Sequence, residues 1–370
     1  MRIHKVIWIP LAIAVAGFCV LWSLRPSPAN SRSGERTVTI TPGKPLDNGK
    51  SVATDPLGGA FDQLKASPDS LQSLKELQEK LAKMNPADAV AWIRDFLKSG
   101  KDKDTGLTFE IESDHTIKQW PTFRTFLIDA LRKIDPAAAA EVSRGILSKP
   151  TTADEWALAL RNVGLADQSA ETNTTLREKT EALINNPGWQ ANPSIGYLNA
   201  FDVLVHTKAV DSTPLLSDLI QRKDRKDLVH AAFLTLDRLV QREPADVLSR
   251  LAADKALQQS RPEMSAQQFA RADVRDPEQQ AIVKTWMLDP ARTGTELNSF
   301  AGVYPNNNHF VSNNLLTTEP NQSGADLATH DRQALEILNT WAADPAFAPV
   351  KDHLATMIAR LNGFVANPNQ

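Results

Sequence analysis

The sequence predicts an all-α protein in which an N-terminal hydrophobic segment and a linker precede one large helical domain. Three observations carry this prediction. Residues 6–24 form an apolar run without a charge, residues 25–58 are rich in Ser, Pro and Gly, and apolar side chains recur with a helical period beyond them. We therefore predict three parts, which are residues 1–24, 25–58 and 59–370.

The hydrophobic run Val6–Leu24 is long enough to cross a hydrocarbon layer of about 30 Å as a helix. Arg2 and Lys5 precede it, which favours an amino terminus in the cytoplasm and a large domain outside it, periplasmic in a two-membrane envelope. We predict an uncleaved signal anchor, hence a single-pass membrane protein. A cleaved signal peptide is the alternative, although its apolar core usually has about 7–15 residues.

The segment 25–58 has almost no large apolar side chain. Such a composition cannot bury enough surface to offset the entropy lost on ordering. We predict a disordered tether between membrane and domain. The single cysteine, Cys19, lies in the hydrophobic run, so the predicted domain is stabilised without disulfides.

Amphipathic helices are predicted through most of residues 59–370, because apolar residues follow the spacing i, i+3, i+4, i+7. The clearest stripes are Ala89, Trp92, Ile93, Phe96 and Leu97, then Phe123, Phe126, Leu127, Ala130, Leu131 and Ile134, and finally Val350, Leu354, Met357, Ile358 and Leu361.

A short phrase with proline in second place recurs roughly every 50 residues. Asn or Asp before the proline caps a helix start, and proline at the first helical position loses no hydrogen bond. Glutamate is a weaker cap. The six phrases are Asn85-Pro86-Ala87, Asp135-Pro136-Ala137, Asn192-Pro193-Ser194, Glu243-Pro244-Ala245, Asp289-Pro290-Ala291 and Asp344-Pro345-Ala346.

These spaced starts and the amphipathic pairs, such as Asn85–Leu97 and Phe123–Leu147, resemble an α-solenoid of the HEAT/armadillo type over residues 69–361. The resemblance implies a right-handed solenoid of helical pairs with an extended binding face. It implies no reaction.

Two stretches interrupt the helical pattern. Residues 99–120 predict a loop, with Thr108–Ile111 as one short strand candidate. Residues 298–330 predict a long loop, and a loop of that length is usually functional or disordered. Its aromatic residues predict that the first half packs against the domain. Turn formation and partner recognition both account for its asparagines, and the candidate interaction residues are Tyr304, Asn306, Asn307, Asn308, His309 and Phe310.

The composition and motifs exclude several classes of function. The formal net charge is −3 with acids and bases interspersed, which argues against nucleic acid as a partner. The basic run Arg222–Lys226 contains Asp224 and predicts a solvated turn between helices. We find no signature of metal ligation, nucleophilic catalysis or phosphate binding, and predict no catalytic residue, metal or cofactor.

The sequence Asp154-Glu155-Trp156 places an aromatic residue beside two acids. A glycosidase uses such a pair of carboxylates. The same residues also fit a capped helix start after Thr152, which we favour because acids stabilise the first helical turn. The alternative function is an α-helical toroid enzyme acting on envelope polysaccharide, with Trp156, Trp189 or Trp286 stacking on sugar rings.

The leading prediction from the sequence is a non-enzymatic scaffold or protein-interaction module. Another protein would be its partner, and residues 6–24 would contact the lipid bilayer and concentrate the module at the membrane.

Overall fold

The computed structural model describes residues 57–366, apart from residue 113 and the segments 308–314 and 319–322. The predicted signal anchor 6–24 and nearly all of the predicted tether 25–58 therefore lie outside the described residues. Residues 55–370 group into one compact unit. Within the described part of this unit, no helix is both long and apolar enough to span a membrane.

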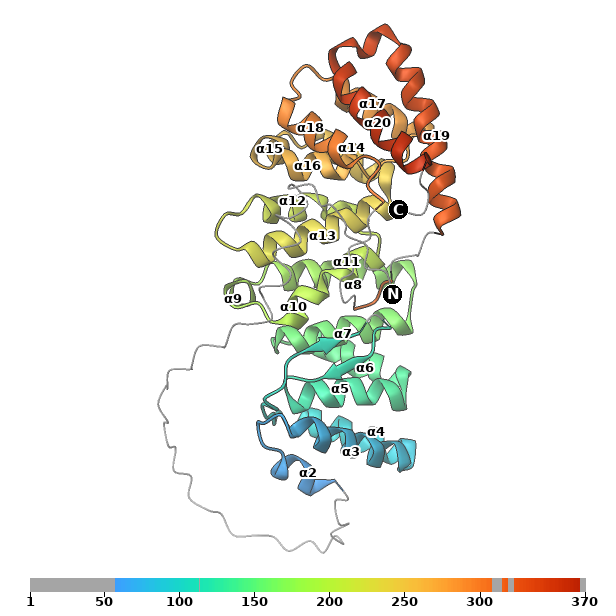
Figure 1. The fold of residues 1–370 in the computed structure, drawn as a ribbon. Coiled ribbons are helices and arrows are strands. Elements are labelled where there is room, and N and C mark those ends of the chain that lie inside the picture. The colour runs from blue at the N-terminus through green and yellow to red at the C-terminus, as the bar shows by residue number, and fades with distance from the viewer. Residues whose placement is uncertain (1–56, 113, 308–314, 319–322, 367–370) are drawn as a thin grey trace, which may run out of the picture. The chain divides into compact units, whose positions relative to one another are not determined.

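The described residues are all-α, with one small hairpin (Figure 1). The elements of the first half are α2 Gly58–Gln63, α3 Ser70–Lys83, α4 Pro86–Lys98, β1 Glu110–Ile111, β2 Ile117–Gln119, α5 Phe123–Ile134, α6 Pro136–Ile146, α7 Ala153–Ala166, α8 Ala170–Ile184, α9 Pro187–Ala191, α10 Ile195–Ala200 and α11 Asp202–His206.

The second half is also helical, and η marks its short 3-10 helices. Its elements are η2 Val210–Ser212, α12 Thr213–Gln221, α13 Lys226–Arg242, α14 Pro244–Ala253, α15 Lys255–Ser260, α16 Pro262–Phe269, α17 Pro277–Leu288, α18 Gly294–Val303, α19 Gly324–Ala343, η3 Pro345–Val350 and α20 Lys351–Ala366.

Helices that are close in the sequence pack against one another, as α5, α6, α7 and α8 do (Figure 1). The predicted stripes form their contacts. Ala89 and Ile93 of α4 are fully buried, the α5 stripe is buried from Phe123 to Leu131, and Leu354 and Leu361 bury one face of α20. One continuous hydrophobic core results, because each helix offers an apolar stripe to the next.

Four of the six proline phrases start helices as predicted. Asn85 and Asp135 cap α4 and α6 with their side chains, Asp344 caps η3, and Glu243 precedes α14 without a side-chain cap. The other two predictions are wrong, because a better cap lies a few residues on. Ser194 caps α10 after Asn192, and Thr293 forms a capping box at the start of α18 after Asp289.

The predicted loop 99–120 lies within the stretch between α4 and α5. It contains the hairpin, in which Glu110 pairs with Gln119 and Ile111 with Ile117, so the strand candidate is confirmed over Glu110–Ile111. The predicted loop 298–330 extends beyond the observed connection at both ends. Helix α18 continues to Val303, and α19 begins at Gly324 behind the cap Ser323, which leaves residues 304–323 as the connection.

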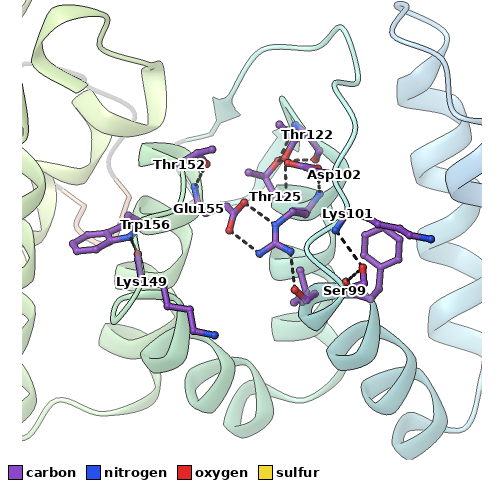
Figure 2. A network of polar contacts seen from close by, with 12 residues as sticks. Ser99, Lys101, Asp102, Thr122, Thr125, Lys149, Thr152, Glu155 and Trp156 are labelled. Carbon is purple, nitrogen blue, oxygen red and sulfur yellow. Dashed lines mark hydrogen bonds and ion pairs between the residues drawn. The ribbon is translucent and has the colours of Figure 1, made fainter. Parts of the chain in front are cut away.

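Buried ion pairs join helices that lie apart in the sequence. Arg124 of α5 donates from Nε and Nη2 to the two carboxylate oxygens of Glu155 in α7, at 2.8 and 3.0 Å. Figure 2 shows Glu155 in this network beside the Thr152 cap. Arg124 Nη1 also donates to the Leu97 carbonyl at the end of α4. One guanidinium thus ties three helices together, and the Glu155 hydrogen bonds raise the pKa of Arg124.

Arg161 and Asp129 form a second such pair between α7 and α5, at 2.5 Å, with both side chains fully buried. Arg161 also lies 3.3 Å from the amide oxygen of Asn162. Buried charges of this kind are costly unless paired, so each pair holds its helices in one relative position.

Replacing Arg124 with methionine should lower the free energy of unfolding by about 3–5 kcal/mol, because Glu155 is then a buried charge without its partner. The double variant R124M/E155L should recover most of this loss, since an apolar pair carries no desolvation cost. Urea unfolding measures both. In the control R94M, whose partner Glu141 is largely exposed, the change should stay within about 1 kcal/mol. Equal losses in R124M and R94M would contradict the role of burial.

Candidate functional site

The connection between α18 and α19 carries the residues that the sequence predicts for interaction. The structure places Tyr304, Asn306 and Asn307 at its start, whereas Asn308, His309 and Phe310 lie outside the described residues. Tyr304 is fully buried and stacks on Phe300 at a centroid distance of 5.2 Å. Its side chain therefore belongs to the core, which removes it from the predicted interaction surface. Asn306 and Asn307 are half-buried.

The first end of the connection is fixed by Arg271, which follows α16. Its Nη1 donates to the Asn306 carbonyl at 2.6 Å, and the Asn306 amide donates to the Ala270 carbonyl at 2.9 Å. The guanidinium itself is held by Asp237 of α13, through hydrogen bonds of 2.8 and 2.9 Å. The backbone at Asn306 is thus clamped to a buried ion pair.

The second end, Leu315–Thr318, contacts α7, α11 and α13. The backbone amides of Leu316 and Thr317 donate to Asp202 Oδ2 at 2.5 and 2.9 Å, and the Thr317 hydroxyl donates to Asp202 Oδ1. Arg238 bonds both Asp202, at 2.7 Å, and the Thr317 hydroxyl. Arg242 donates to the Thr318 carbonyl at 2.9 Å. This segment is thus held by its backbone at Leu316, Thr317 and Thr318 and by the Thr317 side chain.

The two ends depend on neighbouring residues of a single helix. Asp237 fixes the first end through Arg271, and Arg238 fixes the second end with Asp202. Successive helical residues point about 100° apart, so adjacent charges can serve two different directions. We name Asp202, Asp237, Arg238 and Arg271 the connection clamp. Asp202 and Arg238 have side chains only 4% exposed, so the clamp works inside the protein, where charge-assisted hydrogen bonds are strongest.

The second end of the connection also makes apolar contacts. Leu315 and Leu316 are buried, and the end of Leu316 lies against Gly164 of α7. A Cβ atom at Gly164 would lie 3.0 Å from Leu316 Cδ1 and 3.3 Å from Leu176 Cδ1. The absence of a side chain at this position therefore makes the room for Leu316.

The predicted acid–tryptophan site is a structural cap. Thr152 caps α7 as favoured, and Glu155 is engaged by Arg124. Asp154 accepts hydrogen bonds from Ser194 Oγ at 2.6 Å and from the Gly196 amide at 2.9 Å, while burial raises its pKa. These two acids are used to join helices.

The tryptophans that were candidates for sugar stacking pack against other aromatic side chains of the domain. Trp286 is buried and stacks on Phe269 at 4.6 Å, so no sugar reaches its ring. Trp156 is nearly buried, packs edge-on against Trp189 at 5.4 Å and donates its indole N–H to the Lys149 carbonyl. Trp156 and Trp286 are therefore parts of the core, whereas Trp189 is half-buried against Trp156.

The sequence reasoning missed the connection clamp. The signal was present in α13, where Asp237 and Arg238 interrupt the apolar residues Leu236, Leu239 and Val240. A charge within an apolar stripe predicts a buried pair.

No protein-family model, no curated protein and no solved structure matches the chain. Among the described residues, no group of three or more His, Cys, Asp or Glu side chains is arranged to hold a metal ion. In the described site, paired charges hold the backbone of the chain's own connection at both ends.

Gly164→Ala should loosen the second end of the connection, because the new methyl group meets Leu316. We expect a loss of about 1–3 kcal/mol in the free energy of unfolding and faster hydrogen exchange of the Leu316 and Thr317 amides. The matched control is Gly145→Ala in α6, where a Cβ meets nothing within 4 Å. That variant should be unchanged or more stable by up to about 1 kcal/mol. Unaltered exchange of the two amides in G164A would refute the packing argument.

His206 of α11, which lies near Gly164, should make stability depend on pH. Burial lowers its pKa below the ordinary value of 6.5, helped by Arg242 and opposed by Asp202. Between the lowered pKa and 6.5 the unfolded chain binds a proton that the folded chain does not, so stability falls as pH falls through this window. His230 is shifted in the same direction by burial.

Urea unfolding of the parent chain and of H206Q/H230Q, at about pH 7.5 and about pH 5.5, tests this dependence. The parent should lose more stability between the two pH values, and the comparison cancels the contribution of the carboxylates. An equal loss in both chains would show that these histidines do not carry the effect.

Proposed function

We propose that this chain is a membrane-anchored, non-enzymatic scaffold that binds another protein outside the cytoplasm. In this proposal residues 6–24 are the single membrane anchor, residues 25–58 are the tether, and the helical domain is a HEAT-like solenoid of helical pairs. The domain supplies the binding surface, and the anchor raises its effective concentration at the membrane.

The observation that supports binding most directly is the connection clamp. It holds the backbone of Asn306 by a buried ion pair, so the side chains of Asn306 and Asn307 are presented from a rigid base. A rigid base favours recognition, because less conformational entropy is lost on binding. Amide side chains offer both donors and acceptors to a partner.

The use of the buried charges also supports a scaffold. Three of the interior acids are each paired with an arginine, namely Glu155, Asp202 and Asp237. A hydrolase needs carboxyl groups that face its substrate and exchange protons with it. The buried acids here join helices, and the long-range partners they hold are what a stable binding surface requires.

Crosslinking on intact membranes, followed by purification and mass spectrometry, tests the proposal. The full chain should capture a defined partner, and N306A/N307A should capture at least about tenfold less, a change of about 1.4 kcal/mol in binding. The matched control is Asn192→Ala, an exposed asparagine between α9 and α10 that should capture as much as the parent.

The affinity of the purified partner is then measured for the parent chain, N306A/N307A and N192A. If the amides form the contact, the affinities should rank the three chains as the crosslinking yields do. Unfolding curves must be equal, because the Asn306 backbone bonds do not involve its side chain. A partner captured equally by all three chains would move the interface away from the connection. No partner with any chain would refute the scaffold. A chain lacking residues 1–24 should leave the membrane fraction if these residues are the anchor.

A further inference from the structure

His206, the last residue of α11, lies beside the second end of the connection. A Cβ atom placed on Gly164 would lie 3.5 Å from His206 Nε2 and 3.0 Å from Leu316 Cδ1, so the imidazole and the Leu316 side chain lie next to the same point. Leu316 is buried, and His206 is half-buried. Leu316 is thus one of the apolar groups that keep water from the imidazole.

Asp202 precedes His206 by one turn of α11 and makes the main polar contacts with the second end. Its Oδ2 accepts from the Leu316 and Thr317 amides, and its Oδ1 accepts from the Thr317 hydroxyl and from Arg238. A carboxylate has about four acceptor positions. These contacts use all of them, so a protonated His206 finds no free acceptor on this carboxylate while the second end is bound.

The remaining surroundings of His206 also disfavour a positive charge. Side chains that are apolar or absent lie near the imidazole on α7 and α8, at Gly164 and Leu176. Arg242 of α13, which also holds the second end, is a cation. Burial therefore lowers the pKa of His206 below its ordinary value of 6.5, Asp202 opposes this shift, and Arg242 adds to it.

We propose that protonation of His206 releases the second end of the connection, so that Leu315–Thr318 is a pH-sensitive latch. In the released arrangement Asp202 loses its two amide donors, and the freed acceptor positions become available to the imidazolium. Water also reaches the imidazole once Leu316 moves away. The proton thus binds the released arrangement more tightly, and a ligand with such a preference shifts the population toward that arrangement.

The direction of the switch follows from this linkage. Well above pH 6.5 the imidazole is neutral in both arrangements, and the second end stays bound. Between pH 6.5 and the lowered pKa, only the released arrangement takes up the proton, so its population rises by up to about tenfold for each unit that the pH falls. The first end is held by Arg271 with Asp237 and not through His206, so it should stay in place. The latch does not depend on the protein partner proposed above.

Hydrogen–deuterium exchange of the full chain in lipid nanodiscs, resolved to single amides and corrected for the intrinsic exchange rate at each pH, tests the latch. Between about pH 7.5 and about pH 5.5, the protection of the Leu316 and Thr317 amides should fall about three- to tenfold in the parent chain. The Asn306 amide, which donates to the Ala270 carbonyl at the first end, should keep its protection.

In His206→Gln the protection of the Leu316 and Thr317 amides should no longer change with pH. The matched control is His230→Gln in α13. The His230 imidazole is also half-buried, and burial lowers its pKa as well, but it precedes Arg238 by about two turns of the helix. H230Q should therefore keep the pH dependence of the parent.

The change with pH decides the outcome, so a variant whose second end is looser at every pH remains informative. Thermal unfolding checks that H206Q is folded, and H206F, which is also neutral at every pH, replaces it if it is not. A loss of protection at low pH that H206Q removes and H230Q retains supports the latch. Constant protection in the parent, or the same pH dependence in H206Q, overturns it. A parallel loss at the Asn306 amide also overturns it, because the whole domain then opens.

Discussion

The buried pairing of arginine with carboxylate is the interaction on which the helical domain depends. Arg124 with Glu155, Arg161 with Asp129, and Arg238 with Asp202 each join separate helices in the interior. Apolar contacts supply most of the stabilisation, but they are tolerant of small shifts. A buried charge is costly when displaced from its partner, so the pairs define which helix lies where.

The same interaction connects the core to the candidate site. Asp237 and Arg238 are consecutive in α13, and together they hold both described ends of the connection between α18 and α19. The second end is held by Asp202, which lies 115 residues earlier in the chain than Thr317. The connection is therefore part of the fold at its ends, and its half-buried amides are presented from that base.

The helices were predictable and their long-range partners were not. The stripes of α4, α5 and α20, and the starts at Asn85 and Asp135, follow from local periodicity and capping, which the sequence contains in full. The helix starts predicted at Asn192 and Asp289 are wrong, because the N-caps lie a few residues later, at Ser194 and Thr293. The connection clamp joins residues about 35 positions apart, so the local pattern of α13 indicates buried charges at Asp237 and Arg238 but not their partners.

The interfaces between α5, α6 and α7 show why charges are needed for a unique arrangement. Ala138, Ala139 and Ala157 are buried there, and small side chains let the helix backbones approach closely. Small side chains form low ridges, so they restrict the relative position of packed helices less than large ones do. The Arg161–Asp129 pair adds a directional contact between α7 and α5, and Asn162, which donates to the Ile128 carbonyl, adds another. In this domain the apolar contacts therefore determine that the helices pack, and the buried polar groups determine how.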